Sequence, residues 1–320
     1  MNRHFVAALY LLPGSTFCIL NLLTGLALTS KKEFRKPAFY LMTSLCLADA
    51  VELFTIGPYV GVKVLVTGNT TVPSTVDYYI GLLCTSEWWV GSLLFVFIAF
   101  NRFIVITRWQ SAEFWFNAKA VYAYVFGPHL FFLTCMSIYF FFISNNIYVY
   151  EDSILTFVYR IPFFQSLNNV IATSCGLIQV TFNVLTIRGI KMLRKAHSEG
   201  RSAGNMTSDK LNQETKLTIQ CIISSTVYCA CTFCFQCIFA VAPYVVFEVK
   251  HFVIVHMMWM SNHCINPIIY LLFNRPLRDR MREVLMKLCP CVKSQFTNTK
   301  PTSVQNNTTR SVTNEAVWCV

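Results

Sequence analysis

The sequence has 320 residues, of which 55% are hydrophobic and only 13% are charged, and its mean hydropathy is +0.50. An average soluble domain carries about 25% charged residues, so this chain lacks the charge that a water-facing surface needs. The composition excludes disorder over most of the length and excludes a soluble enzyme, which would expose large apolar patches and aggregate. It predicts a membrane protein whose surface contacts the lipid bilayer.

Five runs without Asp, Glu, Lys or Arg are each longer than the ~20 residues that a helix needs to cross the bilayer core. These runs are 4–30, 120–150, 161–187, 217–247 and 251–274. Two further apolar stretches contain ionisable residues but are also long enough to span. None of these stretches has the period-2 alternation of a membrane β-barrel. We therefore expect an all-α membrane protein, with transmembrane helices over 5–29, 38–66, 78–107, 119–143, 160–188, 214–243 and 249–273.

A short amphipathic segment over 275–288 follows the seventh span and is suited to lie along the inner leaflet as an eighth helix. The expected organisation is therefore one helical domain over 1–290 and a disordered tail over 291–320, which is rich in Ser, Thr and Asn. Cys289 and Cys291 come directly after the amphipathic segment and are predicted palmitoylation sites.

The positions of the basic residues predict the orientation of the chain. Of the 26 Lys and Arg residues, 22 lie at one set of helix ends and in the tail. Cytoplasmic loops carry such an excess, so the N-terminus is expected outside the cell and the C-terminus in the cytoplasm. The net charge of +11 thus reflects topology and does not indicate nucleic-acid binding. Asn69, in the sequon Asn69-Thr70-Thr71 of the first outer loop, is a predicted glycosylation site.

Several polar side chains lie inside the predicted spans, where such groups are costly and often functional. Asp49 is near the middle of the second helix, Asn21 is inside the first, and Asn262 and Asn266 share one face of the seventh. These groups either form a polar pocket that holds water or Na⁺, or only join helices through hydrogen bonds. Arg102 closes the third helix and is either functional or an anchor that reaches the lipid headgroups.

Four motifs occur together in this chain. They are Asp49 in Leu-x-Leu-Ala-Asp, Asn101-Arg102-Phe103 at the end of helix three, Asn266-Pro267-Ile268-Ile269-Tyr270 in helix seven, and the basic eighth helix. With these motifs the chain resembles the rhodopsin-like G-protein-coupled receptors. A finer pattern includes Gly81, Trp88, Asn101, Arg102, Asn168, Asn169, Ile219, Gln220, Trp259, His263, Asn274 and Arg278. This pattern is similar to that of the nematode serpentine receptors of class T.

The resemblance implies a chemosensory receptor in the cell membrane, and a sensory cilium as one location. Its partners would be a small-molecule ligand, a heterotrimeric G protein and other receptor chains in a homo- or hetero-oligomer. Arg102 would contact the G protein, and Glu214 would pair with Arg102 in the resting state. Asp49, Asn262 and Asn266 would form an activation-linked pocket, and Tyr270 would be a switch residue. Two features depart from the pattern: Asn101 replaces an acidic residue, and helix six lacks the usual Trp-x-Pro.

In receptors of this kind, the ligand binds between the outer halves of helices three, five, six and seven. Glu87 is about two turns inside helix three, where a carboxylate needs a partner such as a cationic ligand, Lys63 or a nearby Asn. The alternative is that Glu87 is a structural carboxylate whose hydrogen bonds are all made within the protein. Further candidates for ligand contact are Trp88, Asn168, Asn169, Gln236, His256 and Trp259.

Two ligand classes are not expected. Retinal receptors carry a Schiff-base lysine six residues before the Asn of the helix-seven motif, and this position is Met260 here. Amine receptors carry an Asp in helix three at the position of Cys84. No organic cofactor is therefore expected, and no metal other than Na⁺ at Asp49. Helix three and the second outer loop are also not expected to form a disulfide, because no Cys lies between residues 136 and 174.

Other functional classes fit the sequence less well. A transporter or channel would show related halves, interrupted helices or a file of charges. A membrane enzyme needs clustered His and acidic residues or a known catalytic motif, whereas the six His residues are scattered and no such motif appears. We therefore expect a receptor that is not an enzyme, with a transporter, a channel or a non-signalling seven-helix protein as alternatives.

Overall fold

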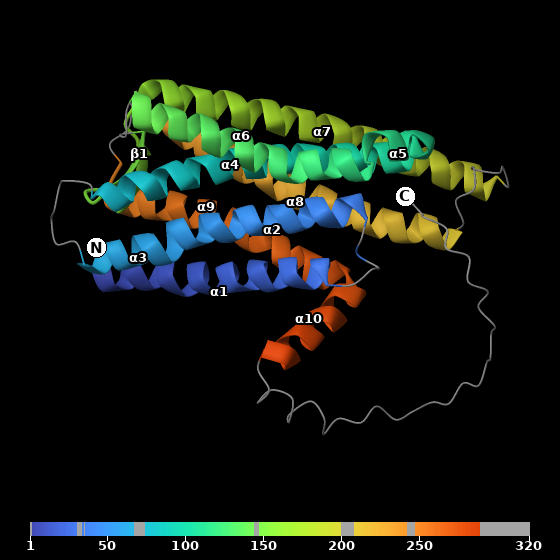
Figure 1. Cartoon of the computed structure of the whole chain (residues 1–320), viewed down its shortest axis with the longest axis horizontal. Coiled ribbons are helices and arrows are strands. Elements are labelled where there is room, and N and C mark those ends of the chain that lie inside the picture. Colours follow the sequence, from blue (N-terminus) through green and yellow to red (C-terminus); the bar gives the residue numbers. More distant parts are fainter. Residues whose placement is uncertain are drawn as a thin grey trace.

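The computed structural model describes residues 2–30, 34, 36–66, 74–143, 147–199, 208–241 and 247–288. Long helices run side by side along the longest axis of the molecule, and a shorter helix leaves the bundle at one end (Figure 1). Asn69, Cys289, Cys291 and the tail over 291–320 lie outside the described residues.

Seven long helical segments form the bundle, as the sequence predicts. They are α1 (Arg3–Thr29), α2 (Pro37–Phe54) with its continuation η2 (Thr55–Tyr59) and α3 (Val60–Val66), α4 (Thr75–Thr107), α6 (Ala118–Phe142), α7 (Pro162–Ser198), α8 (Ser208–Val241) and α9 (Val249–Phe273). Six of these segments are long and apolar enough to cross a membrane. The seventh, α9, has 25 residues, includes buried His and Asn side chains and is not among these six.

The remaining elements are short. The helix α10 (Arg275–Leu288) corresponds to the predicted eighth helix, and η3 (Trp109–Ser111) and α5 (Ala112–Trp115) connect α4 to α6. The predicted bounds of two long helices are wrong: α7 ends at Ser198 instead of residue 188, and α8 begins at Ser208 instead of residue 214. Hydropathy marks only the apolar part of a helix, whereas Lys, Arg and Glu are good helix formers in water and extend it beyond the membrane.

The second span is not a uniform α-helix. Its middle turn, η2, is a π-helix that contains Pro58. Proline has no backbone N–H and clashes with the preceding turn, and a wider turn relieves both problems. At this level α1 and the second span approach closely, since a Cβ added to Gly57 would lie 2.5 Å from the Cα of Gly14. The distortion therefore coincides with a glycine-to-glycine contact that fixes how these two helices pack.

A β-hairpin that the sequence analysis does not predict covers one end of the bundle. Strands β1 (Tyr148–Glu151) and β2 (Thr156–Tyr159) pair antiparallel, with Tyr148 opposite Tyr159. The hairpin rests on α4 at Gly81, where an added Cβ would lie 1.7 Å from the Tyr148 carbonyl oxygen. Only glycine allows this approach. We call this end the hairpin end and the opposite end the α10 end (Figure 1).

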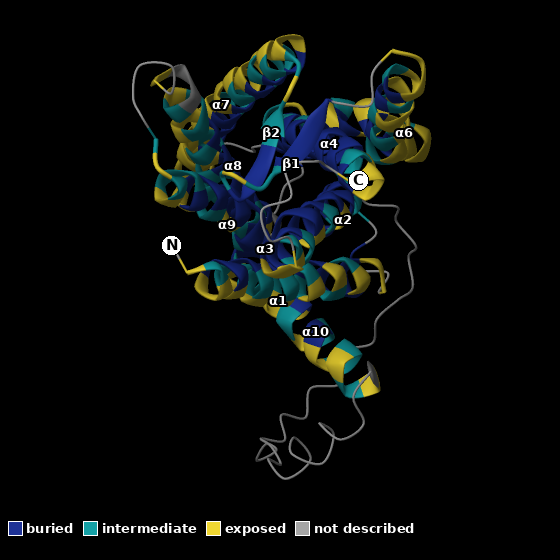
Figure 2. Cartoon of the chain, turned by 90° about the vertical axis from the view of Figure 1, so that its left-hand side faces the viewer, coloured by how far each residue is buried: buried dark blue, intermediate teal, exposed yellow. Residues whose placement is uncertain are grey.

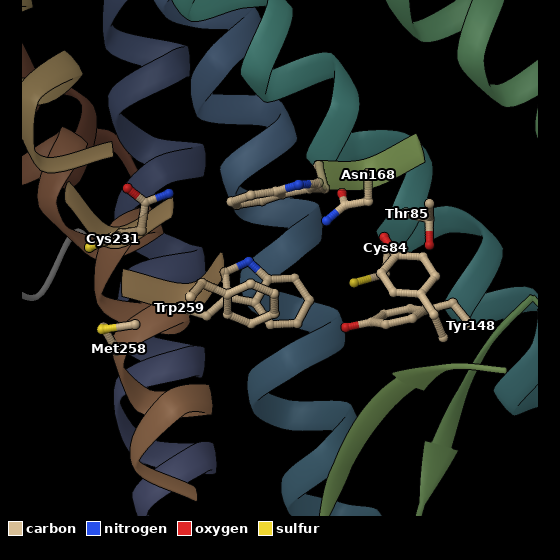
Figure 3. A pocket seen from close by; sticks show the side chains of 11 residues that line it. Cys84, Thr85, Tyr148, Asn168, Cys231, Met258 and Trp259 are labelled. Atoms are coloured by element: carbon tan, nitrogen blue, oxygen red, sulfur yellow. The ribbon is translucent and has the colours of Figure 1, made fainter. Parts of the chain in front are cut away.

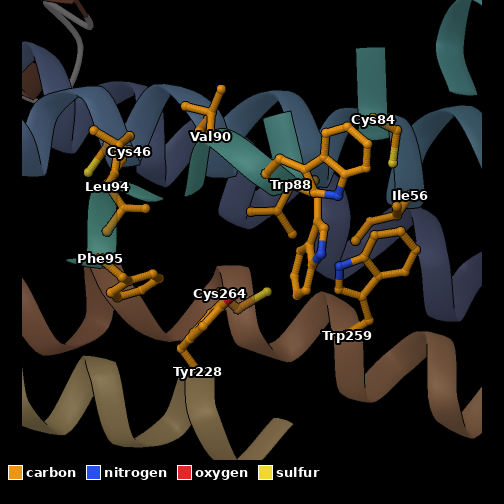
Figure 4. Packing of buried hydrophobic residues seen from close by; sticks show 14 of the residues in the cluster. Cys46, Ile56, Cys84, Trp88, Val90, Leu94, Phe95, Tyr228, Trp259 and Cys264 are labelled. Atoms are coloured by element: carbon orange, nitrogen blue, oxygen red, sulfur yellow. The ribbon is translucent and has the colours of Figure 1, made fainter. Parts of the chain in front are cut away.

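Burial is uneven around the bundle. Figure 2 shows α2, α4 and α9 largely buried, while α6 and α7 turn exposed faces outward. The outward side chains are large and apolar, for example Phe126, Leu130 and Leu177, as expected for helices that contact lipid. Inside the bundle, Trp88 and Trp259 pack beside Cys84 and Ile56, with Tyr228 and Phe95 further toward the α10 end (Figure 4).

Candidate functional site

A small cavity lies beneath the hairpin, between four helices. Eleven residues line it: Cys84, Thr85, Trp88, Tyr148, Tyr159, Asn168, Cys231, Phe235, Met258, Trp259 and Asn262. Figure 3 shows the labelled side chains of α4, α7, α8, α9 and β1 turned toward one another. The volume of the cavity is about 20 Å³, which is close to the space that one water molecule occupies. A larger ligand must therefore move lining side chains.

Aromatic rings make up much of the cavity wall. Trp88 and Trp259 meet edge to face, with their ring centroids 5.8 Å apart, and Tyr148 lies 6.2 Å from Trp259. Burial raises the pKa of both Tyr148 and Tyr159 above the usual value, so both phenols remain neutral. Asn168 is held by Trp89, whose Nε1 donates to Asn168 Oδ1 over 3.1 Å. The wall is thus apolar, neutral and partly rigid.

Three of the predicted ligand residues, Trp88, Asn168 and Trp259, line this cavity. Glu87 does not, because it turns toward α6 and pairs with His129, whose Nδ1 lies 3.0 Å from Glu87 Oε2. The other nitrogen of His129 lies 2.9 Å from Ser44 Oγ on α2. Glu87 therefore has a partner that the sequence analysis does not name, and the pair joins α2, α4 and α6.

The other three candidates also lie outside the cavity wall. Gln236 accepts a hydrogen bond from Thr173 and donates one to the backbone of Asn169, so both candidates belong to the α7–α8 contact. His256 bridges the hairpin and the second span: Nδ1 lies 2.7 Å from Thr156 Oγ1 and Nε2 lies 2.6 Å from the Ile56 carbonyl oxygen. His256 thus fixes the hairpin that covers the cavity.

Deeper in the bundle, Asp49 joins α2 to α9. Its two carboxylate oxygens each lie 2.7 Å from a partner, Oδ1 from His263 Nδ1 and Oδ2 from Asn266 Nδ2. Asn21 donates to the His263 carbonyl oxygen and brings α1 into the same cluster. Asn262 belongs to the cavity wall instead. Sequence reasoning grouped Asn262 with Asp49 because it shares a helix face with Asn266, and did not assign His263 to the cluster.

The oxygen atoms around Asp49 that could coordinate a cation determine whether Na⁺ fits there. Asn21 Oδ1 and Asn266 Oδ1 are buried without a hydrogen-bond partner among the described residues, and amide oxygens suit hard cations. Both oxygens of Asp49 already have partners, however, and a cation at Oδ1 would have to replace the imidazole of His263. The residues present fit Na⁺ only when this imidazole is displaced.

A third acidic residue, Glu52, lies in α2 three residues after Asp49 and is fully buried. The thiol of Cys84 donates to Glu52 Oε2 over 3.3 Å. The second oxygen, Oε1, has no hydrogen-bond partner among the described residues. The sequence analysis assigns Glu52 no site, although the position of a carboxylate within an apolar run was an available signal.

At the α10 end, Arg102 is buried in a network of polar side chains. Its Nη1 donates to Glu214 Oε2 over 2.9 Å, and Nε donates to Asn101 Oδ1 over 3.2 Å. Lys36 Nζ lies 3.4 Å from the second oxygen of Glu214. Arg102 and Glu214 are each about 95% buried, so α2, α4 and α8 are joined by charges that have little access to solvent. Asn101 contacts Arg102, but without the charge of an acidic residue.

A cleft of about 670 Å³ opens beside this network. It lies between the first turn of α2, the first turns of α8, the end of α9 and the start of α10, and its basic residues are Lys36, Lys216 and Arg275. Tyr270, the predicted switch residue, is fully buried in α9 close to this end. Thus the two ends of the bundle differ: one has a small cavity without charged lining residues, and the other has a much larger cleft with three basic residues.

Polar and aromatic contacts lead from the cavity toward the middle of the bundle through α4 and α8. Trp88 lies 5.8 Å from Tyr228 of α8, ring to ring, and the Tyr228 hydroxyl donates to Ser92 Oγ over 2.6 Å. Gln179 of α7 accepts a hydrogen bond from Ser225 of α8. Helix α8 lacks a Trp-x-Pro motif, and in this structure a tryptophan of α4 occupies the region beside Tyr228. The eleven cysteines that the structure describes are free.

The comparisons with known proteins agree with this arrangement. The crystal structure of squid rhodopsin shares the fold with a TM-score of 0.70 and 14% sequence identity, over 92% of this chain and 87% of that chain. Among curated proteins, none matches the sequence. The family described as "Serpentine type 7TM GPCR chemoreceptor Srt" matches residues 1–294. Given this match over nearly the whole helical part, the chain belongs to the Srt family of serpentine seven-transmembrane chemoreceptors and is a chemosensory G-protein-coupled receptor.

Proposed function

We propose that the cavity at the hairpin end is the ligand site and that the network around Arg102 controls the G protein. The observation that carries this proposal is the buried Arg102–Glu214 pair beside an open cleft. Such a pair joins α4 to α8 at rest, and separating its charges in a dry environment is costly. Ligand binding would favour a state in which α8 has moved and the pair is broken.

The same proposal assigns the orientation of the chain. The α10 end carries most of the basic residues, so we place it in the cytoplasm and the hairpin end outside, in the cell membrane or the membrane of a sensory cilium. Asn69 is then an outer glycosylation site, and Cys289 and Cys291 are inner palmitoylation sites. Association with further receptor chains belongs to this proposal as well. A transporter or channel is not favoured, because the family is one of receptors.

The ligand is proposed not to be retinal. Met260 of α9 is buried at the position where a retinal receptor has its lysine, and a thioether cannot form a Schiff base. The likeness to a rhodopsin therefore concerns the arrangement of the helices and does not extend to the chromophore.

The proposal is tested by ligand-independent GTP exchange on purified Gα subunits, in membranes that contain equal amounts of receptor. Glu214→Gln removes the charge that holds Arg102 and should raise basal exchange several-fold. Arg102→Ala should abolish exchange, alone and in combination with Glu214→Gln. Arg108→Ala is the matched control, because Arg108 is exposed at the end of α4. Equal basal exchange in wild type and Glu214→Gln, with both proteins folded, would refute the proposed role of the pair.

A further inference from the structure

The chemistry of the cavity indicates which ligands it can hold. This inference rests on the proposal that the cavity is the ligand site, and it concerns hydrogen bonds that the protein leaves unmade. Trp259 Nε1 and Asn262 Oδ1 are both buried, and neither has a hydrogen-bond partner among the described residues. Burial of an unsatisfied donor or acceptor is unfavourable, so two lining residues in the same helix each call for a partner inside the cavity.

The two unmade bonds are complementary. The indole of Trp259 can only donate, and the Oδ1 atom of Asn262 can only accept. A single hydroxyl group can do both, since its oxygen accepts and its hydrogen donates. The cavity has room for about one water molecule, and a water could satisfy the same two atoms. A ligand hydroxyl would then replace this water without the loss of either hydrogen bond.

The charge of the lining argues against ionised ligands. The eleven lining residues include no acidic and no basic side chain, and burial keeps the two tyrosines protonated. A carboxylate or an ammonium group would enter an apolar space without a counter-charge, which is unfavourable. The nearest acidic group through the wall is Glu52, which contacts Cys84 and is itself fully buried. An amine would have to displace the Cys84 thiol to reach it.

The remaining wall accommodates an apolar body of limited size. Trp88, Phe235 and Met258 provide apolar surface from three helices, and an unbranched Met side chain adapts to irregular shapes. The cavity has room for about one water molecule, so lining side chains must move to admit an apolar body, and this requirement limits the ligand to a few carbon atoms or one ring. We propose that the cavity binds a small neutral alcohol, whose hydroxyl accepts a hydrogen bond from Trp259 Nε1 and donates one to Asn262 Oδ1.

The test compares ligands that differ only in the polar group. One set is 1-hexanol, hexylamine, hexanoate, 2-hexanone and hexane, and the other is benzyl alcohol, benzylamine, benzoate and toluene. We expect the alcohols to activate GTP exchange and to raise the thermal unfolding temperature of the purified receptor. The ketone can accept but not donate, so it should act at concentrations at least ten-fold higher. The hydrocarbons and the ionised compounds should have no effect.

Two substitutions remove the proposed bonds while they keep the shape of the cavity. Trp259→Phe removes the N–H and keeps an aromatic ring, and Asn262→Leu keeps the volume and removes the acceptor. Each should raise the alcohol concentration for half-maximal response by about ten-fold to a hundred-fold. The matched control is Trp115→Phe, since Trp115 does not line the cavity, and this variant should respond as wild type does.

The outcomes separate this inference from the proposed function. If Glu214→Gln raises basal exchange but no alcohol activates or stabilises the folded receptor, the ligand class is wrong and the proposed coupling stands. If amines activate, and Glu52→Gln abolishes that response, the cavity is a cation site and the inference is overturned. An alcohol response that survives both Trp259→Phe and Asn262→Leu would refute the proposed binding geometry.

Discussion

The indole of Trp88 meets the imidazole of His263 edge to face, with the ring centroids 5.8 Å apart and an angle of 73° between the planes. Trp88 lines the cavity, and His263 binds Asp49 of α2. Trp88 also contacts the ring of Tyr228 in α8. One side chain therefore touches the proposed ligand, the Asp49 cluster and the helix that holds Glu214.

This position predicts that Trp88 transmits ligand binding. Trp88→Ala removes edge-to-face contacts that are each worth about 0.5–1.5 kcal/mol, so we expect the ligand-stimulated part of GTP exchange to fall about ten-fold. Trp88→Phe keeps a ring and should have an intermediate effect. Glu214 is proposed to act after ligand binding has been transmitted through Trp88. Glu214→Gln should therefore raise basal exchange equally in the wild-type receptor and in the Trp88→Ala variant. A wild-type ligand response from folded Trp88→Ala receptor would contradict the prediction; Trp115→Phe, at an exposed site on α5, serves as the control.

A second prediction concerns sodium. In the wild type the imidazole of His263 lies 2.7 Å from Asp49 Oδ1, and a cation there would have to compete with it. We expect basal exchange to be the same in NaCl and in choline chloride of equal ionic strength. His263→Ala exposes Asp49 together with the free amide oxygens of Asn21 and Asn266, so exchange in this variant should decrease in NaCl. The variant His263→Ala/Asp49→Asn should be insensitive to sodium again, and sodium sensitivity of the wild type would show that the imidazole does not block the site.

The contact between Asn101 and Arg102 leads to a third prediction. Asn101 Oδ1 accepts from Arg102 but carries no charge, whereas a carboxylate at this position would add a Coulomb attraction to the guanidinium. Asn101→Asp should therefore hold Arg102 more firmly and lower basal exchange several-fold, whereas Asn101→Ala should raise it. The prediction is that basal exchange falls in one variant and rises in the other. If basal exchange changes in the same direction in both variants, the cause is a folding defect or an unrelated role for Asn101.

The sequence predicted the helices well because hydropathy over ~20 residues is a strong signal in a membrane protein. It also singled out Asp49, Asn266 and Arg102, since polar groups in apolar runs are conspicuous, and the structure places each of them in a polar contact. It could not find His129 as the partner of Glu87, because that contact depends on how α4 and α6 pack. The hairpin was missed for a related reason: β1 and β2 have four residues each, too few for a periodic pattern to stand out.

The glycine beneath the hairpin gives the last prediction. A Cβ on Gly81 would lie 1.7 Å from the carbonyl oxygen of Tyr148, and a backbone atom cannot move aside as the end of a side chain can. Gly81→Ala must therefore lift β1 from α4 and disturb Tyr148 in the cavity wall. We expect a loss of stability of about 1–3 kcal/mol, as for other overpacked cores, together with a weaker ligand response.

Gly127→Ala in α6 is the control for this substitution. An added Cβ at Gly127 has no neighbouring atom within 4 Å, and alanine is a better helix former than glycine by about 1 kcal/mol. Thermal unfolding of the detergent-purified receptor should therefore shift down for Gly81→Ala and remain equal or shift up for Gly127→Ala. Equal unfolding temperatures for Gly81→Ala and wild type, with an unchanged ligand response, would mean that the hairpin does not need its close approach to α4. In that case the cavity would be closed by His256 and its contacts with Thr156 and Ile56 alone.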